Sequence, residues 1–174
     1  MEIKLVIWII NLYKHHGSKG SYIAIDNLGF YSIITDGETL SNNYTYISYA
    51  FDNYFIFKAE DGFYGLINAY SGVQIEPNQY TFMLKVDGKN AIEAVTAEGV
   101  RDIYSSKIEK VLSVKNAVLE TINDDFTSIH SNSECYYIDQ NGQIVSNTEV
   151  FPENNIYAFE QNGKWGYKDK AGKV

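Results

Sequence analysis

A short motif of glycines and one large aromatic residue recurs along the chain, and this recurrence constrains the fold more than any other feature. Its clearest copy is at the C-terminus, where Gly163 and Gly172 flank the pair Trp165-Gly166. Asn162-Gly163 is a hairpin signal, because a two-residue type I′ turn needs positive φ at both central positions. The copy therefore predicts a strand, a turn, a second strand and another turn.

A second copy lies in the first half of the chain. Gly62 and Gly72 flank Tyr64-Gly65 in the same order, and another apolar run follows and ends at Pro77. Proline cannot donate a ladder hydrogen bond, so it suits a strand end or an edge. This copy predicts a unit of about three strands.

Weaker copies extend the pattern into an array with a period of about 25 to 35 residues, which is typical of stacked supersecondary units. The copies are placed near residues 22–48, 54–80, 82–100, 126–150 and 156–174. Residues 1–19 precede the array as an N-terminal cap or strand, and residues 20–174 form the repeat domain. The last copy lacks a third strand, which predicts either continuation in a longer chain or an edge that pairs with another chain.

No clear copy covers residues 100–125. Apolar residues in 105–122 fit one face of a helix, but β-branched residues and Asn116 fit two decayed strands equally well. Both interpretations remain open at this point.

The aromatic content supports a mainly β fold. The chain has 15 Tyr and 9 Phe but only 2 Pro, a balance that suits pleated, half-buried surfaces. We expect an array of antiparallel hairpin or three-stranded units in an elongated or superhelical row, with a closed β-propeller as the alternative.

These motifs resemble the WG-repeat family of bacterial proteins, which is named for the Trp-Gly pair. The resemblance covers roughly residues 20–174, although only the last copy has the tryptophan itself. It implies an array of β units without an accepted enzymatic activity, so no catalytic residue carries over. The residues that match the motif are Tyr64, Gly65, Gly163, Trp165, Gly166 and Gly172.

The inner glycine of the motif has a physical explanation. A glycine beside a large aromatic residue in a strand leaves a gap where a neighbouring ring can approach closely. We therefore expect Gly65 and Gly166 to serve packing and not chemistry.

The net charge limits the classes of partner. A formal charge of −8 and a pI near 4.8 disfavour nucleic acid and anionic lipid. The apolar run Leu5–Ile10 is far shorter than the roughly 20 residues of a membrane-spanning helix. The sequence does not fix a compartment, and the lack of a signal-peptide cleavage site favours the cytoplasm.

Residues with possible catalytic chemistry do not form a convincing set. His130 lies near Cys135, but in this degenerate copy Cys135 takes the place of a packing aromatic, which predicts a small buried hydrophobe. Cys135 is the single cysteine, so no intrachain disulfide can form. We expect no catalytic residues and no enzyme.

The sequence evidence for a metal or phosphate site is equally weak. His15 and His16 are adjacent and would point to opposite faces of a strand. The segment Asp139–Gly142 resembles the start of a calcium loop but lacks the later glutamate, so it predicts a hairpin turn. Gly17–Gly20 is too short for a phosphate-binding loop. We expect no metal and no cofactor.

In the sequence, the expected architecture is the only guide to function. We expect a non-enzymatic repeat module for protein or peptide binding or scaffolding; the alternative is an acidic immunity-type inhibitor of a basic toxin. The Tyr-rich segment Tyr44–Tyr49 could stack on a peptide or glycan, but core or cross-strand packing is the favoured interpretation.

Overall fold

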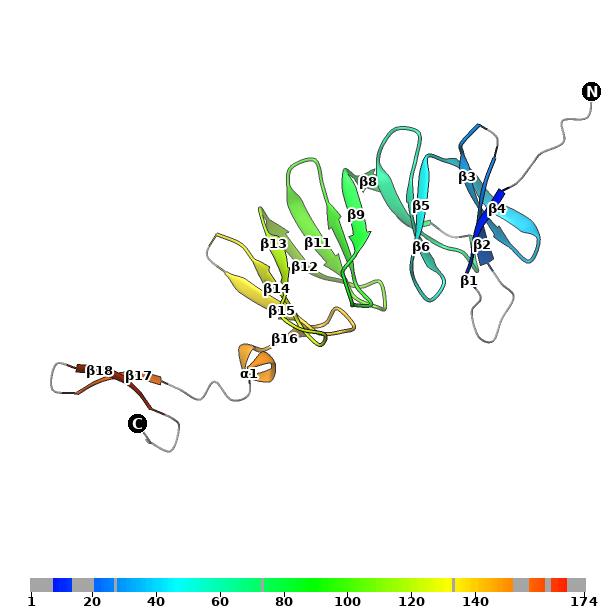
Figure 1. The fold of residues 1–174 in the computed structure, drawn as a ribbon. Coiled ribbons are helices and arrows are strands. Elements are labelled where there is room, and N and C mark those ends of the chain that lie inside the picture. The colour runs from blue at the N-terminus through cyan, green and yellow to red at the C-terminus, as the bar shows by residue number, and fades with distance from the viewer. Residues whose placement is uncertain are drawn as a thin grey trace, which may run out of the picture.

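The computed structural model describes residues 8–13, 21–26, 28–72, 74–132, 134–151, 157–161 and 164–168. They form antiparallel strands and one short helix, α1 (Asn147–Val150). Four sheets of four strands stand side by side in chain order (Figure 1), and in each sheet the strands pair in sequence order. No helix among the described residues is long and apolar enough to cross a membrane.

The strands fall into four meanders and a hairpin. Sheet 1 contains β1 (Trp8–Tyr13), β2 (Ser21–Ile25), β3 (Tyr31–Thr35) and β4 (Glu38–Tyr44). Sheet 2 contains β5 (Tyr46–Phe51), β6 (Tyr54–Lys58), β7 (Tyr64–Asn68) and β8 (Gln74–Tyr80). Sheet 3 contains β9 (Phe82–Lys85), β10 (Ile92–Val95), β11 (Val100–Tyr104) and β12 (Lys110–Lys115). Sheet 4 contains β13 (Val118–Thr121), β14 (Thr127–His130), β15 (Cys135–Ile138) and β16 (Ile144–Val145). The hairpin pairs β17 (Tyr157–Gln161) with β18 (Lys164–Lys168).

The expectation of a mainly β array of antiparallel units is confirmed. The row is open, because sheets 1 and 4 lie at opposite ends of it (Figure 1). The unit, however, has four strands and not three. Sheets 2, 3 and 4 begin at Tyr46, Phe82 and Val118, so both intervals are 36 residues. The predicted copies 54–80 and 126–150 omitted the first strand of their units, β5 and β13.

The predicted third copy, residues 82–100, is out of phase. Gly62 lies between the second and third strands of sheet 2, whereas Gly88 lies between the first and second strands of sheet 3. The true counterpart of Gly62 is Gly99. Matching turns by glycine alone shifted the copy by one strand, and this shift created the apparent gap over residues 100–125.

The helix considered for residues 105–122 is wrong, and the alternative of two strands is correct. Residues 110–115 form β12, which pairs with β11, and residues 118–121 form β13, which pairs with β14. Asn116 turns the chain between them with φ of 56°. One cross-strand partner for each strand thus overrides a helical spacing in a stretch rich in β-branched residues.

A common hairpin loop connects many of the strands. In it the fourth residue has positive φ and its N–H donates to the carbonyl of the first residue, at 2.9 to 3.1 Å. Glycine fills the fourth place in four loops, and Ile108, with φ of 60°, fills it in the fifth; the members are Gly29, Gly62, Gly99, Ile108 and Gly142. The two-residue turn predicted at Asn162-Gly163 lies outside the described residues. Asp36-Gly37, with φ of 56° and 82°, has the dihedral signs of such a turn.

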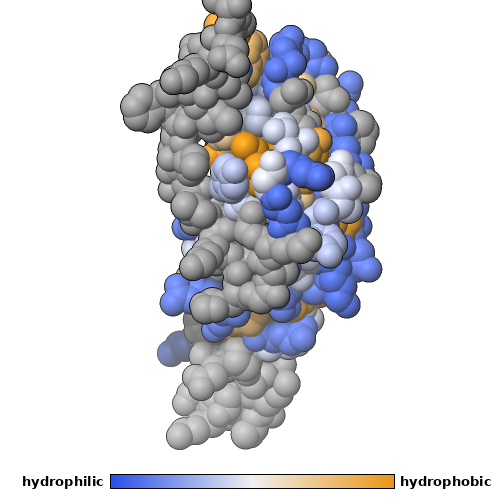
Figure 2. All heavy atoms as spheres, turned by 90° about the vertical axis from the view of Figure 1, so that its right-hand side faces the viewer, coloured by the Kyte–Doolittle hydropathy of each residue, from blue (hydrophilic) through white to orange (hydrophobic). Residues whose placement is uncertain are grey.

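The core lies between consecutive sheets. In β6, Phe55 and Phe57 pack with the cluster that includes Ile33 of sheet 1, while Ile56 packs with the cluster that includes Ile92 of sheet 3. A third cluster joins sheet 3 to Ile129 and its neighbours in sheet 4. Inner sheets therefore bury both faces, which explains continuous apolar runs in place of strict alternation. Seen from the sheet 1 end, hydrophilic side chains surround smaller hydrophobic areas (Figure 2).

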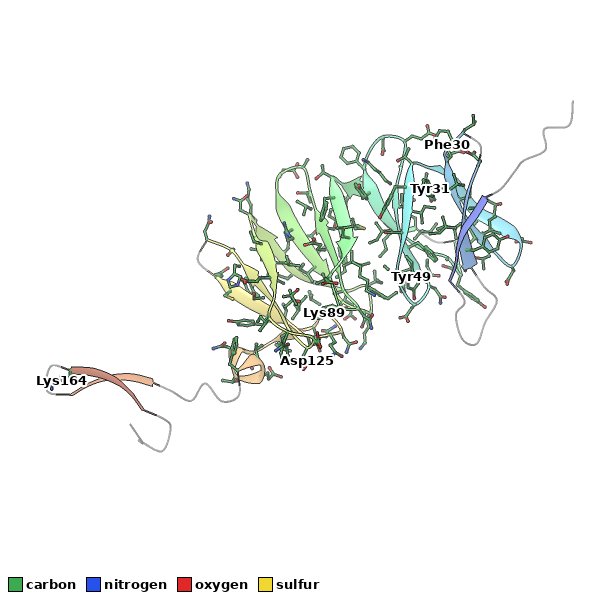
Figure 3. All side chains as sticks on the ribbon, in the orientation of Figure 1. Phe30, Tyr31, Tyr49, Lys89, Asp125 and Lys164 are labelled. Atoms are coloured by element: carbon green, nitrogen blue, oxygen red, sulfur yellow. The ribbon has the colours of Figure 1, made fainter. Side chains whose placement is uncertain are left out.

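Polar contacts tie the loops of sheets 3 and 4 together. Lys89 is only 1% exposed, and its Nζ donates to the carbonyl oxygens of Asn123 at 3.2 Å and Asp124 at 2.9 Å. Figure 3 shows Lys89 beside the loop that carries Asp125. Backbone N–H groups also cross this junction, from Asn90 to the Gln140 carbonyl at 2.7 Å among others.

Gly142 provides a test of this close approach. A Cβ there would lie 2.7 Å from Ala91 Cβ and 3.1 Å from Ser105 Cα, whereas a Cβ at Gly62 would meet nothing within 4 Å. Both have positive φ, so alanine costs about 1 kcal/mol of conformational strain at either. Gly142→Ala should lower the free energy of unfolding, measured in urea, by about 1–3 kcal/mol more than Gly62→Ala does. The reason is that only at position 142 does the added methyl group crowd neighbouring atoms. Equal losses would contradict the tight junction between sheets 3 and 4.

Candidate binding surface on the fourth sheet

Sheet 4 has one face against sheet 3 and a second face whose residues are mainly polar. The packed face contributes Leu119, Ile129, Tyr136 and Ile138 to the core cluster shared with sheet 3. By register and alternation, the other face carries Val118, Glu120, Ser128, His130, Cys135, Tyr137 and Val145. We call this set the outer face of sheet 4.

A cleft of about 320 Å³ opens on the outer face. Its lining is Glu120, Thr121, Ile122, Ser128, His130, Tyr137 and Phe151. Phe151 comes from outside the sheet, directly after α1, and its N–H donates to the Asn147 carbonyl at 2.9 Å. The rings of Tyr137 and Phe151 stand at 85° with centroids 5.8 Å apart. Helix α1 thus brings a second aromatic wall to the cleft.

Two hydrogen bonds from Ser146 to Glu149 hold the start of α1. The Ser146 N–H donates to Glu149 Oε2 at 2.7 Å, and the Ser146 hydroxyl donates to the same oxygen at 2.7 Å. These hydrogen bonds lower the pKa of Glu149 below its usual value. Glu149 is therefore ionised and holds the first turn that precedes Phe151.

The polar side of the cleft is a chain of hydrogen bonds. Ser128 Oγ donates to the Glu120 carbonyl at 3.1 Å and lies 2.9 Å from His130 Nε2. With the hydroxyl hydrogen on the carbonyl, His130 in its Nε2–H form is the donor to Ser128. This geometry does not activate Ser128 as a nucleophile, since a general base must accept that proton. Glu120 Oε2 lies 3.9 Å from the same His130 nitrogen.

Cys135 is exposed, so the prediction of a small buried hydrophobe is wrong. It lies opposite His130 on the outer face, where no described sheet packs on it. Its Sγ lies 3.9 Å from the Tyr136 carbonyl oxygen. The Cys135 side chain raises the pKa of Tyr137 above its usual value of 10.0, so this ring of the cleft stays uncharged at neutral pH.

The negative charge of the chain is concentrated in this unit. Residues 116–151 hold no Lys or Arg and six acidic residues: Glu120, Asp124, Asp125, Glu134, Asp139 and Glu149. The rest of the chain holds the other 16 of the 22 acidic residues against all 14 basic ones. Six of the eight net negative charges therefore belong to sheet 4 and its helix.

A second polar cluster lies between sheets 2 and 3. Asp102 accepts hydrogen bonds from Tyr80 Oη at 2.9 Å and Ser113 Oγ at 2.7 Å, and its Oδ2 lies 2.8 Å from Lys110 Nζ. Burial acts to raise the pKa of Asp102, but these donors outweigh it and leave the pKa below its usual value. Burial raises the pKa of Tyr80 above 10.0. These side chains contact one another across the boundary between sheets 2 and 3, and we call them the clamp between these sheets.

The motif residues lie on strands where the structure describes them. Gly65 of β7 is opposite Phe57, and Gly166 of β18 is opposite Phe159, so the two pairs share one register. The Phe57 ring is met by Tyr44 of sheet 1, with centroids 4.5 Å apart. Tyr64 and Trp165 are the residues that precede these glycines, while Gly163 and Gly172 lie outside the described residues.

The structure describes some of the other candidate sites from the sequence, and the rest lie outside the described residues. Asp139 Oδ1 accepts from the N–H groups of Asn141 at 2.9 Å and Gln143 at 2.8 Å, so this carboxylate caps a hairpin loop as predicted. Within the described part of the chain, no group of three or more His, Cys, Asp or Glu residues is placed to hold a metal. His15, His16 and Gly17–Gly20 lie outside that part.

The rings of the Tyr-rich segment Tyr44–Tyr49 pack against other rings, as the favoured interpretation of the sequence predicted. Besides the Tyr44 contact, Tyr49 meets Phe55 at 5.6 Å and Tyr46 meets Tyr64 at 6.3 Å, both edge-on. The register between β5 and β6 shifts between Tyr49 and Phe51.

Sequence reasoning did not find the cleft. Its residues come from three strands and from Phe151, which follows the sheet, so no single spacing marks them. One signal was available: Ser128 and His130 alternate with Thr127 and Ile129, in a strand whose counterpart in sheet 2 is apolar on both faces.

The chain matches no protein-family model and no curated protein sequence. Among solved structures, it is similar to the computationally designed Ika4 protein, with 14% identity, 76% of this chain and 97% of Ika4 covered, and a TM-score of 0.37. It is also similar to the WD40 β-propeller domain of Doa1, with 12% identity, 83% and 52% coverage, and a TM-score of 0.38. For BamB from Moraxella catarrhalis the identity is 13%, the coverage 92% and 54%, and the TM-score 0.34. The chain thus spans about half of the last two.

The clamp between sheets 2 and 3 predicts a pH dependence. The pKa of Asp102 is lower in the folded chain than its usual value, so its contribution is present above about pH 4 and is lost as the pH falls through the folded value. Asp102→Asn should cost about 2 kcal/mol in urea unfolding at neutral pH. The difference from the unmodified chain should shrink below about pH 4. A difference that does not change with pH would show that the carboxylate is not held ionised by these donors.

Proposed function

We propose that the chain is a non-enzymatic module that binds a protein or peptide, and that it does so with the outer face of sheet 4. One observation carries this proposal. The faces between sheets are filled by large apolar residues such as Ile56 and Ile103, whereas the outer face bears a cleft with polar and aromatic walls. Such a mixture of rings and hydrogen-bonding groups is typical of recognition surfaces.

The chemistry of the cleft supports binding over catalysis. Ser128 Oγ donates to the Glu120 backbone carbonyl, and His130 Nε2 lies 2.9 Å from the same Ser128 oxygen. These hydrogen bonds hold the Ser128 and His130 side chains in place. A pre-organised surface of this kind lowers the entropy lost when a ligand binds.

We also propose that the architecture is a diverged WG-type array. Support comes from the shared register in which an inner glycine lies opposite phenylalanine, at Gly65–Phe57 and at Gly166–Phe159. In sheet 2 the ring opposite the glycine receives a tyrosine from the neighbouring sheet. Under this proposal the Trp-Gly pair supports packing, and the ligand is bound elsewhere.

A second function is an acidic inhibitor of the immunity type, acting on a basic toxin. The concentration of six carboxylates without Lys or Arg in residues 116–151 favours it. Complementary charge speeds association and is screened by salt. Binding that weakens steeply with added salt would favour the inhibitor over the general module.

The proposal is tested by selecting peptides from an unbiased displayed library on the full chain. Enriched peptides should lose about tenfold or more in affinity when His130→Trp fills the cleft from the outer face with a large uncharged side chain. Thr39→Trp, at an exposed position in sheet 1, is the matched control and should bind normally. Failure to enrich any peptide, or equal loss in both variants, would contradict binding at the outer face.

A further inference from the structure

We infer that the cleft on sheet 4 binds a cationic side chain, arginine foremost, from a basic segment of the protein partner. This inference rests on the proposed function and names the chemistry of its ligand. It is carried by a comparison of sheet 4 with sheets 2 and 3: in sheet 2 a cation lies over a ring, and in sheet 3 a cation lies over a ring and pairs with a carboxylate.

Sheets 2 and 3 supply cations to their own rings. Lys58 Nζ lies 5.2 Å from the centroid of the Tyr64 ring in sheet 2, and Lys110 Nζ lies 5.4 Å from that of Tyr104 in sheet 3. Lys110 also pairs with the Asp102 carboxylate at 2.8 Å. A ring, an ammonium group and a carboxylate thus form one complete arrangement in sheet 3.

Sheet 4 has the rings and the carboxylate but no Lys or Arg. Tyr137 and Phe151 form a corner of two rings at 85°, and Glu120 lines the same cleft. Residues 116–151 contain no Lys or Arg, and Lys89, which reaches this unit from sheet 3, donates to backbone carbonyls. A cation from a partner would complete the arrangement that sheet 3 completes internally.

Glu120 is accessible to such a ligand. Its side chain is 76% exposed, and its carboxylate lies 3.9 Å from His130 Nε2, beyond hydrogen-bonding distance. The carboxylate therefore keeps its acceptor capacity. In contrast, the Glu93 carboxylate of sheet 3 already binds Arg101 at 2.7 Å.

Arginine fits the two elements of the cleft better than lysine does. Its planar guanidinium stacks on an aromatic ring and presents two parallel N–H donors to one carboxylate. The other carboxylates of residues 116–151, including Asp125 and Glu149, raise the local concentration of a basic segment before it docks. Anionic ligands are repelled by the same field.

The experiment titrates the full chain with a labelled capped peptide of alternating glycine and arginine, followed by fluorescence anisotropy. The matched control peptide has citrulline in place of arginine, because citrulline keeps the shape and loses the charge. We expect the citrulline peptide to bind at least about tenfold more weakly. Equal binding of the two peptides would overturn the inference.

Variants locate the site. Glu120→Gln and Tyr137→Leu should each weaken binding of the arginine peptide roughly three- to tenfold. Glu60→Gln and Tyr70→Leu, an exposed carboxylate and a 64% exposed ring in loops of sheet 2, should change it less than about twofold. Equal effects of Glu120→Gln and Glu60→Gln would mean non-specific attraction to an acidic chain and would overturn the inference. Because Glu120 is exposed, its variant stays informative even if Tyr137→Leu does not fold.

The outcome separates this inference from the proposed function. Library peptides that carry no basic residue, yet lose affinity on His130→Trp, would overturn the cationic ligand and leave the binding module in place. Arginine-rich peptides that respond to Glu120→Gln in the same selection would support both.

Discussion

Face-to-face packing of consecutive sheets is the interaction on which the rest of the structure depends. No sheet of four short strands encloses a core by itself; Phe55 and Phe57 are buried only because sheet 1 covers them, and Ile56 only because sheet 3 does. Each large apolar side chain buried in this way contributes about 1.5–3 kcal/mol. Stability is therefore shared between neighbours, as in other repeat arrays. Sheets 2 and 3 each supply two packing faces.

The same constraint explains where polar groups occur. Between sheets, Asp102 is paired with Tyr80, Lys110 and Ser113, and Lys89 donates to two carbonyl oxygens, while Thr127 Oγ1 is buried without a hydrogen-bond partner among the described residues. On the outer face of sheet 4 the constraint is lifted, and Glu120 is left largely exposed there. The proposed binding function thus lies on the face that packing does not use, beside most of the net negative charge.

Much of the array could be predicted from the sequence, because turn glycines and aromatic runs are local signals. The phase was harder: Gly88 occupies a different connection from Gly62, and Ile108 takes a loop position where glycine is usual, so glycine spacing misplaced the third copy and suggested a gap. The strands over residues 110–121 depend on cross-strand partners that periodicity cannot reveal. The cleft depends on the register of β13, β14 and β15 and on the path of Phe151 after α1. These features depend on tertiary structure, as does the exposure of Cys135, so local sequence patterns do not reveal them.

Hydrogen exchange measured strand by strand tests the central claim most directly, namely that neighbouring sheets provide the stability and that no described sheet packs on the outer face of sheet 4. Backbone amides of β6 and β10, in sheets with neighbours on both sides, should exchange slowest in the free chain, and those of β14 and β15 should exchange faster. Protection in sheet 4 equal to or greater than that in sheet 2 would contradict the account.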